Sequence, residues 1–153
     1  MPNSNLTILG IDPGTKKIGY GVVKFSENCF IYQTAGIFNI KISIQKQLEN
    51  LIIDYHPQLM GIEKVYFGVN KTSALKVSEI KGIIKNAASD LKIIELAPTQ
   101  VKLIICGYGR ADKQAVKKMV KNSLDLPKDL KSKDGIDALA IALAAFYIKR
   151  LDK

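Results

Sequence analysis

The chain has 153 residues, of which 23 are Lys or Arg and 14 are Asp or Glu, so its formal net charge is +9 at pH 7. Hydrophobic residues make up 47% of the sequence, which excludes an intrinsically disordered or fibrous protein. The excess of positive charge favours a polyanionic partner, either nucleic acid or an anionic membrane surface. No apolar run approaches the ~20 residues that cross a bilayer, and no secretory signal opens the chain, so we expect a cytoplasmic protein without a membrane partner.

The length predicts one domain, residues 1–153, with short flexible ends at 1–5 and 150–153. No repeat, low-complexity segment or long linker divides it. The two cysteines, Cys29 and Cys106, do not have the spacing of a metal site, and we expect both to be buried and chemically inert.

Three β-rich segments occupy the first part of the chain. Residues 6–11 form an apolar run that ends at the Asp-Pro-Gly turn signal of residues 12–14. Segments 18–25 and 30–38 follow and are separated by the turn-prone residues 26–28. Such short connections predict an antiparallel three-stranded meander.

Helical and strand patterns alternate in the rest of the chain. The predicted elements are a helix at 44–55 that ends at His56, a strand at 59–63, a helix at 72–90, a strand at 93–96, a short helix from a Thr99 cap to about Cys106, a basic helix at 113–124 and an Ala-rich amphipathic helix at 134–149. A meander followed by such units predicts an α/β fold. Its mixed five-stranded sheet is antiparallel over the first three strands and is flanked by helices on both faces.

Four carboxylates occupy positions that favour a metal site. Asp12 ends the first predicted strand and Glu63 ends the fourth, while Asp134 and Asp137 lie one turn apart at the start of the last helix. If the first and fourth strands are neighbours, these side chains converge at one edge of the sheet. Oxygen ligands without thiolate or imidazole suit Mg²⁺ or Mn²⁺. Two such ions would act on the attacking and leaving oxygens of a phosphodiester, a chemistry that matches the basic surface.

Each carboxylate also has a purely structural interpretation. Asp12 before Pro-Gly is typical of a turn, and Glu63 is placed to pair with a lysine such as Lys64. Asp134 or Asp137 is suited to cap the last helix. One of these residues alone is weak evidence for a catalytic site, but all four on a chain of charge +9 favour the metal site.

Basic residues gather on the helix predicted at 113–124. Those that share one broad face are Lys113, Lys117, Lys118 and Lys121. A lysine cluster is commonly no more than a solvated face, but the adjoining Gly-Tyr-Gly-Arg loop at 107–110 permits close approach to a phosphate. We therefore expect this helix and loop, including Lys117 and Arg110, to contact a nucleic-acid backbone.

Several motifs occur in the order of a known family. They are Gly10-Ile11-Asp12-Pro13-Gly14 and Gly19-Tyr20-Gly21, then Ile62-Glu63-Lys64-Val65-Tyr66, Asn70 and Ala74-Leu75-Lys76, then Gln100-Val101-Lys102, the Gly-x-Gly-x-Ala-x-Lys run at 107–113, and the Asp-x-x-Asp-Ala-Leu-Ala-Ile-Ala run at 134–142. Together they resemble the RuvC family of Holliday junction resolvases over about residues 6–146. The segment before Glu63 is about two helical turns shorter than the family pattern, and position 115 is Ala where that pattern has Gln.

The resemblance implies an RNase H-like fold, a homodimer, and a metal-dependent endonuclease that makes paired symmetric nicks across a four-way DNA junction in recombination and repair. The implied cofactor is Mg²⁺, two ions per active site, for which Mn²⁺ substitutes. The implied protein partners are the RuvA and RuvB branch-migration proteins.

The resemblance also implies roles for single residues. The implied metal ligands are Asp12, Glu63, Asp134 and Asp137. Tyr66 matches an aromatic position that packs against an unstacked base, and Lys102 and Lys113 match lysines that face the DNA backbone. Because Lys113 lies next to the glycine-containing loop, it is our candidate catalytic lysine, whereas Lys102 is our candidate for positioning the DNA.

Three other functions remain open at this point. An RNase H-like nuclease of the YqgF type would act on RNA, and a junction-binding module would not cut at all. An ATPase-type phosphate binder would use Ile11 to Thr15 as a phosphate loop, as in the actin and sugar-kinase superfamily, but it needs two domains around a nucleotide. The contexts of Tyr66 and of the Asp134 and Asp137 pair favour the junction resolvase.

Overall fold

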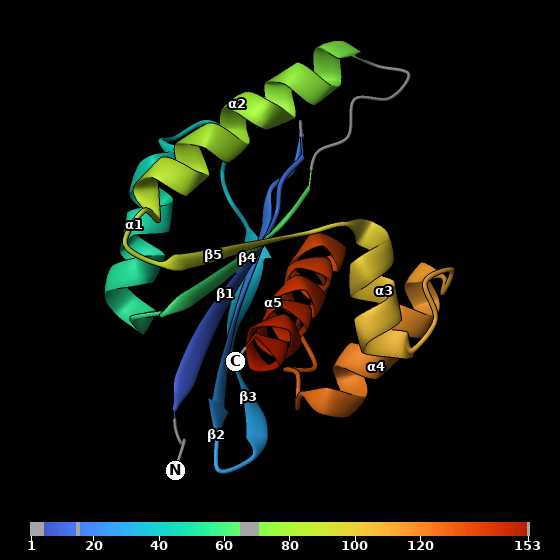
Figure 1. Ribbon diagram of the computed structural model, residues 1–153. Helices are drawn as coiled ribbons and strands as arrows, with labels where there is room; N and C mark the ends of the chain where they lie inside the picture. Colours follow the sequence, from blue (N-terminus) through green and yellow to red (C-terminus); the bar gives the residue numbers. More distant parts are fainter. Residues whose placement is uncertain (1–4, 15, 65–70, 153) are drawn as a thin grey trace.

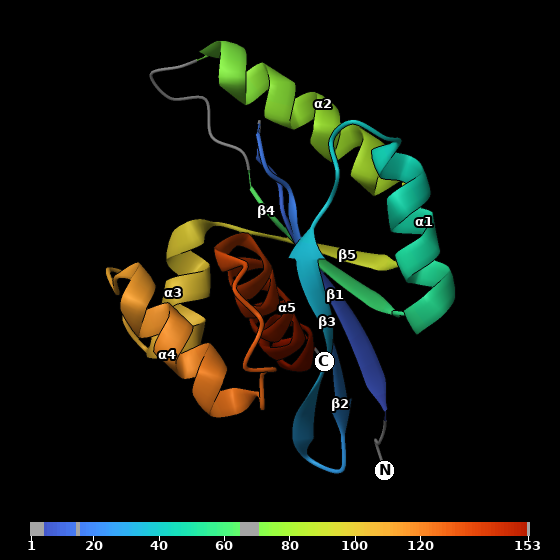
Figure 2. The ribbon, with the colours of Figure 1, turned by 180° about the vertical axis from the view of Figure 1, so that it is seen from behind.

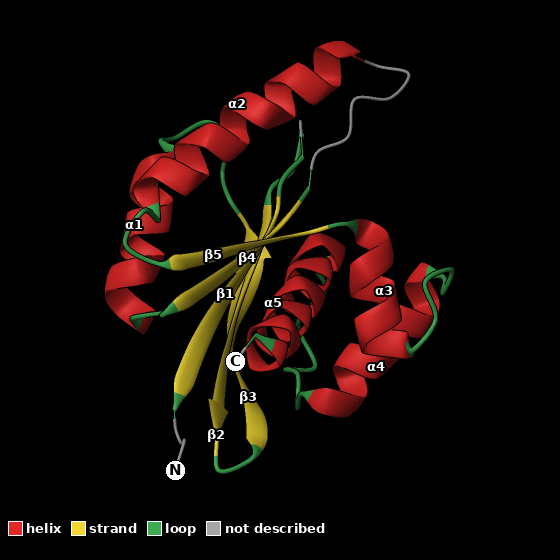
Figure 3. Cartoon of the chain, in the orientation of Figure 1, coloured by secondary structure: helices red, strands yellow, loops and turns green. Residues whose placement is uncertain are grey.

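The computed structural model describes residues 5–14, 16–64 and 71–152. The strands are β1 (Leu6–Asp12), β2 (Gly19–Ser26), β3 (Cys29–Ile37), β4 (Leu59–Glu63) and β5 (Lys92–Leu96). The helices are α1 (Ile44–Tyr55), α2 (Lys71–Ala87), α3 (Pro98–Cys106), α4 (Lys113–Ser123) and α5 (Lys133–Leu151). Figure 3 colours these helices and strands by type, and Figure 1 shows their course along the chain.

The strands form one five-stranded mixed sheet in the order β3-β2-β1-β4-β5. The first three strands are an antiparallel meander, and β4 and β5 extend the sheet with parallel pairing. The turn between β2 and β3 places Glu27 and Asn28 at φ values of 51° and 63°. Two successive residues with positive φ are typical of a tight hairpin whose twist matches that of the strands. The predicted fold class is therefore confirmed.

Helices cover the two faces of the sheet in separate groups. α1 and α2 lie on one face, and α3, α4 and α5 lie on the other, as the two opposite views show (Figures 1 and 2). Because neighbouring residues of a strand point to opposite faces, Ile8 packs in the cluster around α5 while Leu9 and Ile11 pack beneath α1 and α2. From Ile8 to Ile11, β1 is consequently apolar and buried on both sides.

The last helix is buried almost all round. The prediction of an amphipathic helix is wrong, because every residue from Ala138 to Phe146 is buried, in contact with the sheet on one side and with α3 and α4 on the other. α5 also runs further than predicted, to Leu151. Arg150 belongs to it and places its guanidinium 5.6 Å from the ring centroid of Phe146. Within the described ranges, no helix combines the length and the apolar character needed to span a bilayer.

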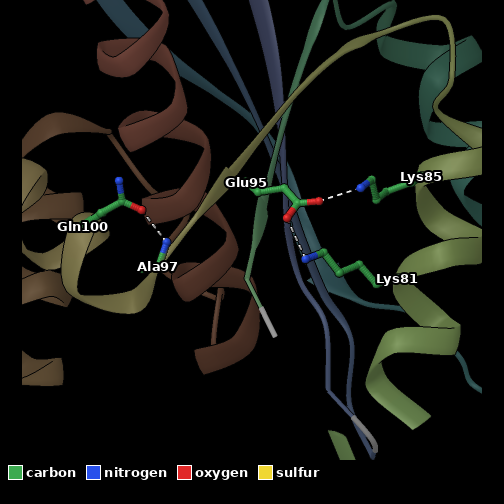
Figure 4. A network of polar contacts seen from close by, with 5 residues as sticks. All are labelled: Lys81, Lys85, Glu95, Ala97 and Gln100. Atoms are coloured by element: carbon green, nitrogen blue, oxygen red, sulfur yellow. Dashed lines mark hydrogen bonds and ion pairs between the residues drawn. The ribbon is translucent and has the colours of Figure 1, made fainter. Parts of the chain in front are cut away.

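The start of α3 differs from the prediction. Thr99 is not the cap, because Pro98 is already helical and Ala97 is the N-terminal cap residue. Proline suits the first helical position, since its missing N–H has no helical partner there and its φ is already helical. The Gln100 side-chain oxygen accepts a hydrogen bond from the Ala97 N–H at 2.7 Å, which satisfies the donor at the cap (Figure 4).

Both cysteines lie nearer the surface than predicted. Cys29 opens the edge strand β3 and is exposed, and Cys106 ends α3 and is only partly buried. The expectation of two buried thiols is therefore wrong. Burial, and then the charge of Asp112, raises the pKa of Cys106, which favours the protonated thiol.

One carboxylate ties α2 to the edge of the sheet. Glu95 on β5 accepts from the Lys85 ammonium at 2.6 Å and from the Lys81 ammonium at 3.1 Å (Figure 4). These lysines, with Lys85 the stronger partner, lower the pKa of Glu95 despite its partial burial. The two ion pairs fix the orientation of α2 above β5.

Candidate active site

Two neighbouring strands bring Asp12 and Glu63 together. β1 pairs with β4 in parallel, with Ile11 opposite Ile62, so the residues that follow end at the same edge of the sheet. The sequence predicted this convergence only if the two strands are neighbours, and the structure shows that they are. The two side chains lie close enough that hydrogen bonding to Glu63 helps to raise the pKa of Asp12.

The first turns of α5 bring the other two carboxylates to the same place. Ser132 is the cap of this helix, and its hydroxyl accepts a hydrogen bond from the Gly135 N–H at 2.9 Å. Asp134 and Asp137 are therefore not needed as caps. One carboxylate oxygen each of Asp12, Asp134 and Asp137 lie within 4.8 Å of one another.

A row of glycines lets α5 approach the sheet this closely. Gly10 on β1 lies opposite Gly21 on β2 and Gly61 on β4, so three adjacent strands lack side chains at the same level. A methyl group at Gly10 would overlap the carbonyl oxygen of Ala138, and one at Gly61 would lie 2.7 Å from the Ala145 Cβ. The missing side chains thus set the depth at which the helix rests, and with it the separation of the carboxylates.

The carboxylates perturb one another strongly. Burial raises the pKa of Asp12 to about 8, helped by the hydrogen bond and charge of Glu63 and by the charges of Asp137 and Asp134. Burial also raises the pKa of Asp137, an effect that the Lys113 ammonium opposes and the Asp134 charge reinforces. Without a cation, Asp12 therefore holds a proton at neutral pH. A divalent cation beside Asp12 would favour the charged carboxylate and so oppose both the burial and the repulsion that raise this pKa.

The carboxylates open into a pocket of about 250 Å³. Its lining residues are Asp12, Glu63, Asp137, Lys102, Lys113, Pro98, Val101, Val116, Ala140 and Ile141. Lys102 comes from α3, and Lys113 is the first residue of α4, whose cap Asp112 accepts a hydrogen bond from the Ala115 N–H at 2.8 Å. The two lysines that the sequence singled out thus line the same pocket as the carboxylates.

The remaining predicted residues lie further out. Arg110 is exposed in the loop between α3 and α4, and Lys117 is partly buried on α4, and neither lines the pocket. Tyr66 and Asn70 lie outside the described residues. His56 is exposed and caps the C-terminal end of α1, as predicted, with its N–H donated to the Ile52 carbonyl oxygen. The apolar wall of the pocket and the glycine row were not predicted from the sequence.

The donor set fits hard divalent cations. Carboxylate oxygens are the ligands that Mg²⁺ and Mn²⁺ prefer, and three of them converge within 4.8 Å. Glu63, hydrogen-bonded to Asp12, supplies a fourth carboxylate beside them. The only histidine, His56, is at the far end of α1, so the pocket offers neither imidazole nor thiolate. Asp12, Glu63, Asp134 and Asp137 are therefore suited to hold such ions.

Solved structures with a similar fold include Holliday junction resolvases. The chain matches a structure described as Thermus thermophilus RuvC in complex with a Holliday junction substrate, with a TM-score of 0.85, 25% identity and 96% coverage of both chains. A fowlpox virus Holliday junction resolvase shares the fold, with a TM-score of 0.60 and 18% identity. The fold and the carboxylate cluster together define an RNase H-like nuclease.

Sequence comparisons narrow this class to one family. The family model of the crossover junction endodeoxyribonuclease RuvC matches residues 8–145, and the chain belongs to this family. A RuvC of Caldanaerobacter subterraneus subsp. tengcongensis is 39% identical over 150 residues, which cover 90% of each chain. A RuvC of Thermosipho melanesiensis is also 39% identical, over 90% of this chain and 94% of its own. The resemblance stated from the motifs is confirmed.

Proposed function

We propose that this chain resolves four-way DNA junctions by metal-dependent hydrolysis of phosphodiester bonds, with paired symmetric nicks in recombination and repair. The observation that carries the proposal is the convergence of Asp12, Asp134 and Asp137 within 4.8 Å beside two pocket lysines. Its support also includes membership of a family whose members are named crossover junction endodeoxyribonucleases. The nuclease activity follows from the family, and the residue roles below are our proposal.

Four carboxylates are proposed to hold the metal: Asp12, Glu63, Asp134 and Asp137. Mg²⁺ is the proposed ion, two per site, with Mn²⁺ as a substitute. When bound, such ions supply Lewis-acid polarisation of the scissile phosphate and a lower pKa for the attacking water. The protein contributes the frame that holds the carboxylates, because α5 packs closely on the glycine row, where an added methyl group would overlap the helix.

The lysines of the pocket are proposed to act on the phosphate. Lys113 lies close enough to Asp137 to lower the pKa of that carboxyl, so its ammonium is near the reacting phosphate in our proposal. There it would stabilise the charge that develops in the transition state. Lys102, on the neighbouring helix, would position the strand, and Arg110 and Lys117 would bind its backbone further from the cut.

Other parts of the proposal concern the assembly. A homodimer would place two such sites across one junction, and Leu75 and Ile83, exposed by 57% and 44% on α2, offer an apolar contact for it. Tyr66 would pack against an unstacked base at the junction centre. RuvA and RuvB are the proposed partners in branch migration.

Cleavage of matched substrates tests the proposal. Purified protein should nick a synthetic four-way DNA junction in Mg²⁺ or Mn²⁺, and leave a linear duplex and an RNA duplex of the same sequence intact. Binding should persist in EDTA or Ca²⁺, because the basic surface does not depend on the metal. Preferred cutting of the RNA would establish the YqgF-type alternative, and binding without cutting in any divalent metal would establish the non-catalytic one.

A further inference from the structure

Half of the pocket lining has no part in the chemistry proposed above. This apolar wall is formed by Pro98, Val101, Val116, Ala140 and Ile141, from three different helices. Val101 and Val116 line the pocket with 7% of their surface exposed, whereas Ala140 and Ile141 lie deeper, at 1% and 3%. The wall borders the same space as Asp12, Glu63 and Asp137.

A nucleotide whose phosphate reaches the carboxylates must bring a sugar to this space, because the sugar is bonded directly to the phosphate. The polar groups that line the pocket are three carboxylates and two ammonium groups. In the proposed function the carboxylates hold cations and the ammonium groups hold phosphate oxygens. The side chains of the wall offer only methyl and methylene groups.

We propose that this apolar wall selects deoxyribose over ribose at the nucleotide beside the scissile phosphate. The inference rests on the proposed function and adds to it the residues that distinguish DNA from RNA. A deoxyribose presents an apolar C2′ methylene to the wall, which matches it. A ribose presents a hydroxyl that loses its water without gaining a partner, so cutting slows by about tenfold to a hundredfold.

Single-atom changes in the substrate test this selection. Three kinds of junction are compared. The first is all DNA, the second carries one ribonucleotide on one side or the other of the cut, and the third carries a 2′-fluoro nucleotide at the same position. The 2′-fluoro sugar keeps a ribose-like pucker without the hydroxyl. In single-turnover cleavage at saturating protein, at least one ribonucleotide position should slow cutting about tenfold or more, and its 2′-fluoro counterpart should cut at nearly the all-DNA rate. Equal rates for all junctions, or a 2′-fluoro sugar as slow as ribose, would overturn the proposal.

A protein variant assigns the effect to the wall. Val116→Thr replaces a wall methyl by a hydroxyl that can pair with the 2′-hydroxyl, so the ratio of DNA to ribonucleotide cutting should fall several-fold. Val120→Thr is the matched control, because Val120 is buried one turn later on α4 and does not line the pocket. Its ratio should stay at the wild-type value.

Val101→Thr repeats the test from α3 should Val116→Thr fail to fold. An unchanged ratio in the folded wall variant would overturn the assignment. Failure of the wild-type protein to cut the all-DNA junction would instead refute the proposed function.

Discussion

Gly19 of β2 lies directly against the main chain of Asp134, so that a methyl group at position 19 would overlap the Asp134 carbonyl oxygen and come within 3.0 Å of its Cβ. The main chain that carries one proposed metal ligand thus rests on a strand that contributes no chemistry. The position of the Asp134 carboxylate depends on the absence of a side chain beneath it. Gly19 therefore links the packing of the sheet to the geometry of the site.

Gly19→Ala should damage the site through this contact. The added methyl group forces the first turn of α5 away from β2, and the carboxylates separate. We expect a lower free energy of unfolding and a weaker affinity for Mn²⁺, measured by denaturant titration and calorimetry. Gly82→Ala is the control, since nothing lies within 4 Å of a methyl group there. On the exposed side of α2 it should stabilise the protein by about 0.5–1 kcal/mol. Mn²⁺ binding to Gly19→Ala at wild-type strength would contradict this role.

Asp12→Asn and Glu63→Gln should each abolish cleavage and leave junction binding intact or tighter. Each change removes a carboxylate suited to hold the cation, and it also removes negative charge beside the phosphates. Junction affinity in Ca²⁺ and single-turnover cleavage in Mg²⁺ measure the two effects separately. Asp54→Asn, at an exposed position on α1, should change neither. Near-normal cutting by either site variant would mean that the site lies elsewhere.

The metal-free protein should lose stability as the pH rises from about 4 to about 8. The pKa of Asp12 is 3.8 in its reference state and about 8 in the folded protein, so over this interval the folded state holds a proton that the unfolded chain has released. Stability from this group is complete below the lower value and lost above the higher one, at up to about 1.4 kcal/mol per pH unit. Denaturant titrations across pH measure this slope.

Mg²⁺ should therefore stabilise the protein more at pH 8 than at pH 5, because at lower pH it competes with the proton on Asp12. Calorimetry in two buffers of different ionisation enthalpy should detect proton release on binding at pH 7. Asp12→Asn removes the titrating group and should flatten the pH slope. The same slope in wild type and Asp12→Asn would show that another group is responsible.

Alanine substitutions of the two pocket lysines should have different effects on cleavage and on binding. Lys113→Ala should lower the cutting rate of the saturated complex, because the charge near Asp137 is lost from the reacting phosphate. Lys102→Ala should chiefly weaken junction binding. The slope of the logarithm of the binding constant against the logarithm of the salt concentration should become about one unit less steep. Lys46→Ala, on the opposite face in α1, serves as the control for loss of charge alone. Unchanged cutting rates and salt slopes for both pocket variants would mean that these lysines only face solvent and do not act on the DNA.

The sequence predicts the elements well and their tertiary packing less well. Asp12 and Glu63 each follow a short apolar strand, so their convergence required only that the strands be neighbours. The row of Gly10, Gly21 and Gly61 could not be predicted in this way, because it depends on the register of β1 with β2 and with β4, which lies far away in the chain. Local patterns do not determine that register.

The last helix shows the same difference. Its many alanines are only weakly apolar, and charged residues lie at both of its ends. This pattern predicts an amphipathic helix with one exposed side. They are buried because α3 and α4 cover the side away from the sheet. Small residues are needed where helix and glycine row approach within contact distance, such as Ala142 above Gly10. Burial of this kind is a property of the assembled layers, and the sequence of the helix alone does not determine it.

The position of α5 in the chain also determines when the protein can become active during its synthesis. Asp12 lies on β1, whereas Asp134 and Asp137 lie on α5, which follows all five strands in the chain and is therefore made after them. Chains begin to fold from their N-terminal part while they are still being made, and the sheet that carries Asp12 and Glu63 is complete in sequence well before this helix emerges. A growing chain therefore holds two of its four carboxylates without the other two. Under the proposed function, the site that these four residues form is complete only once α5 has docked on the sheet.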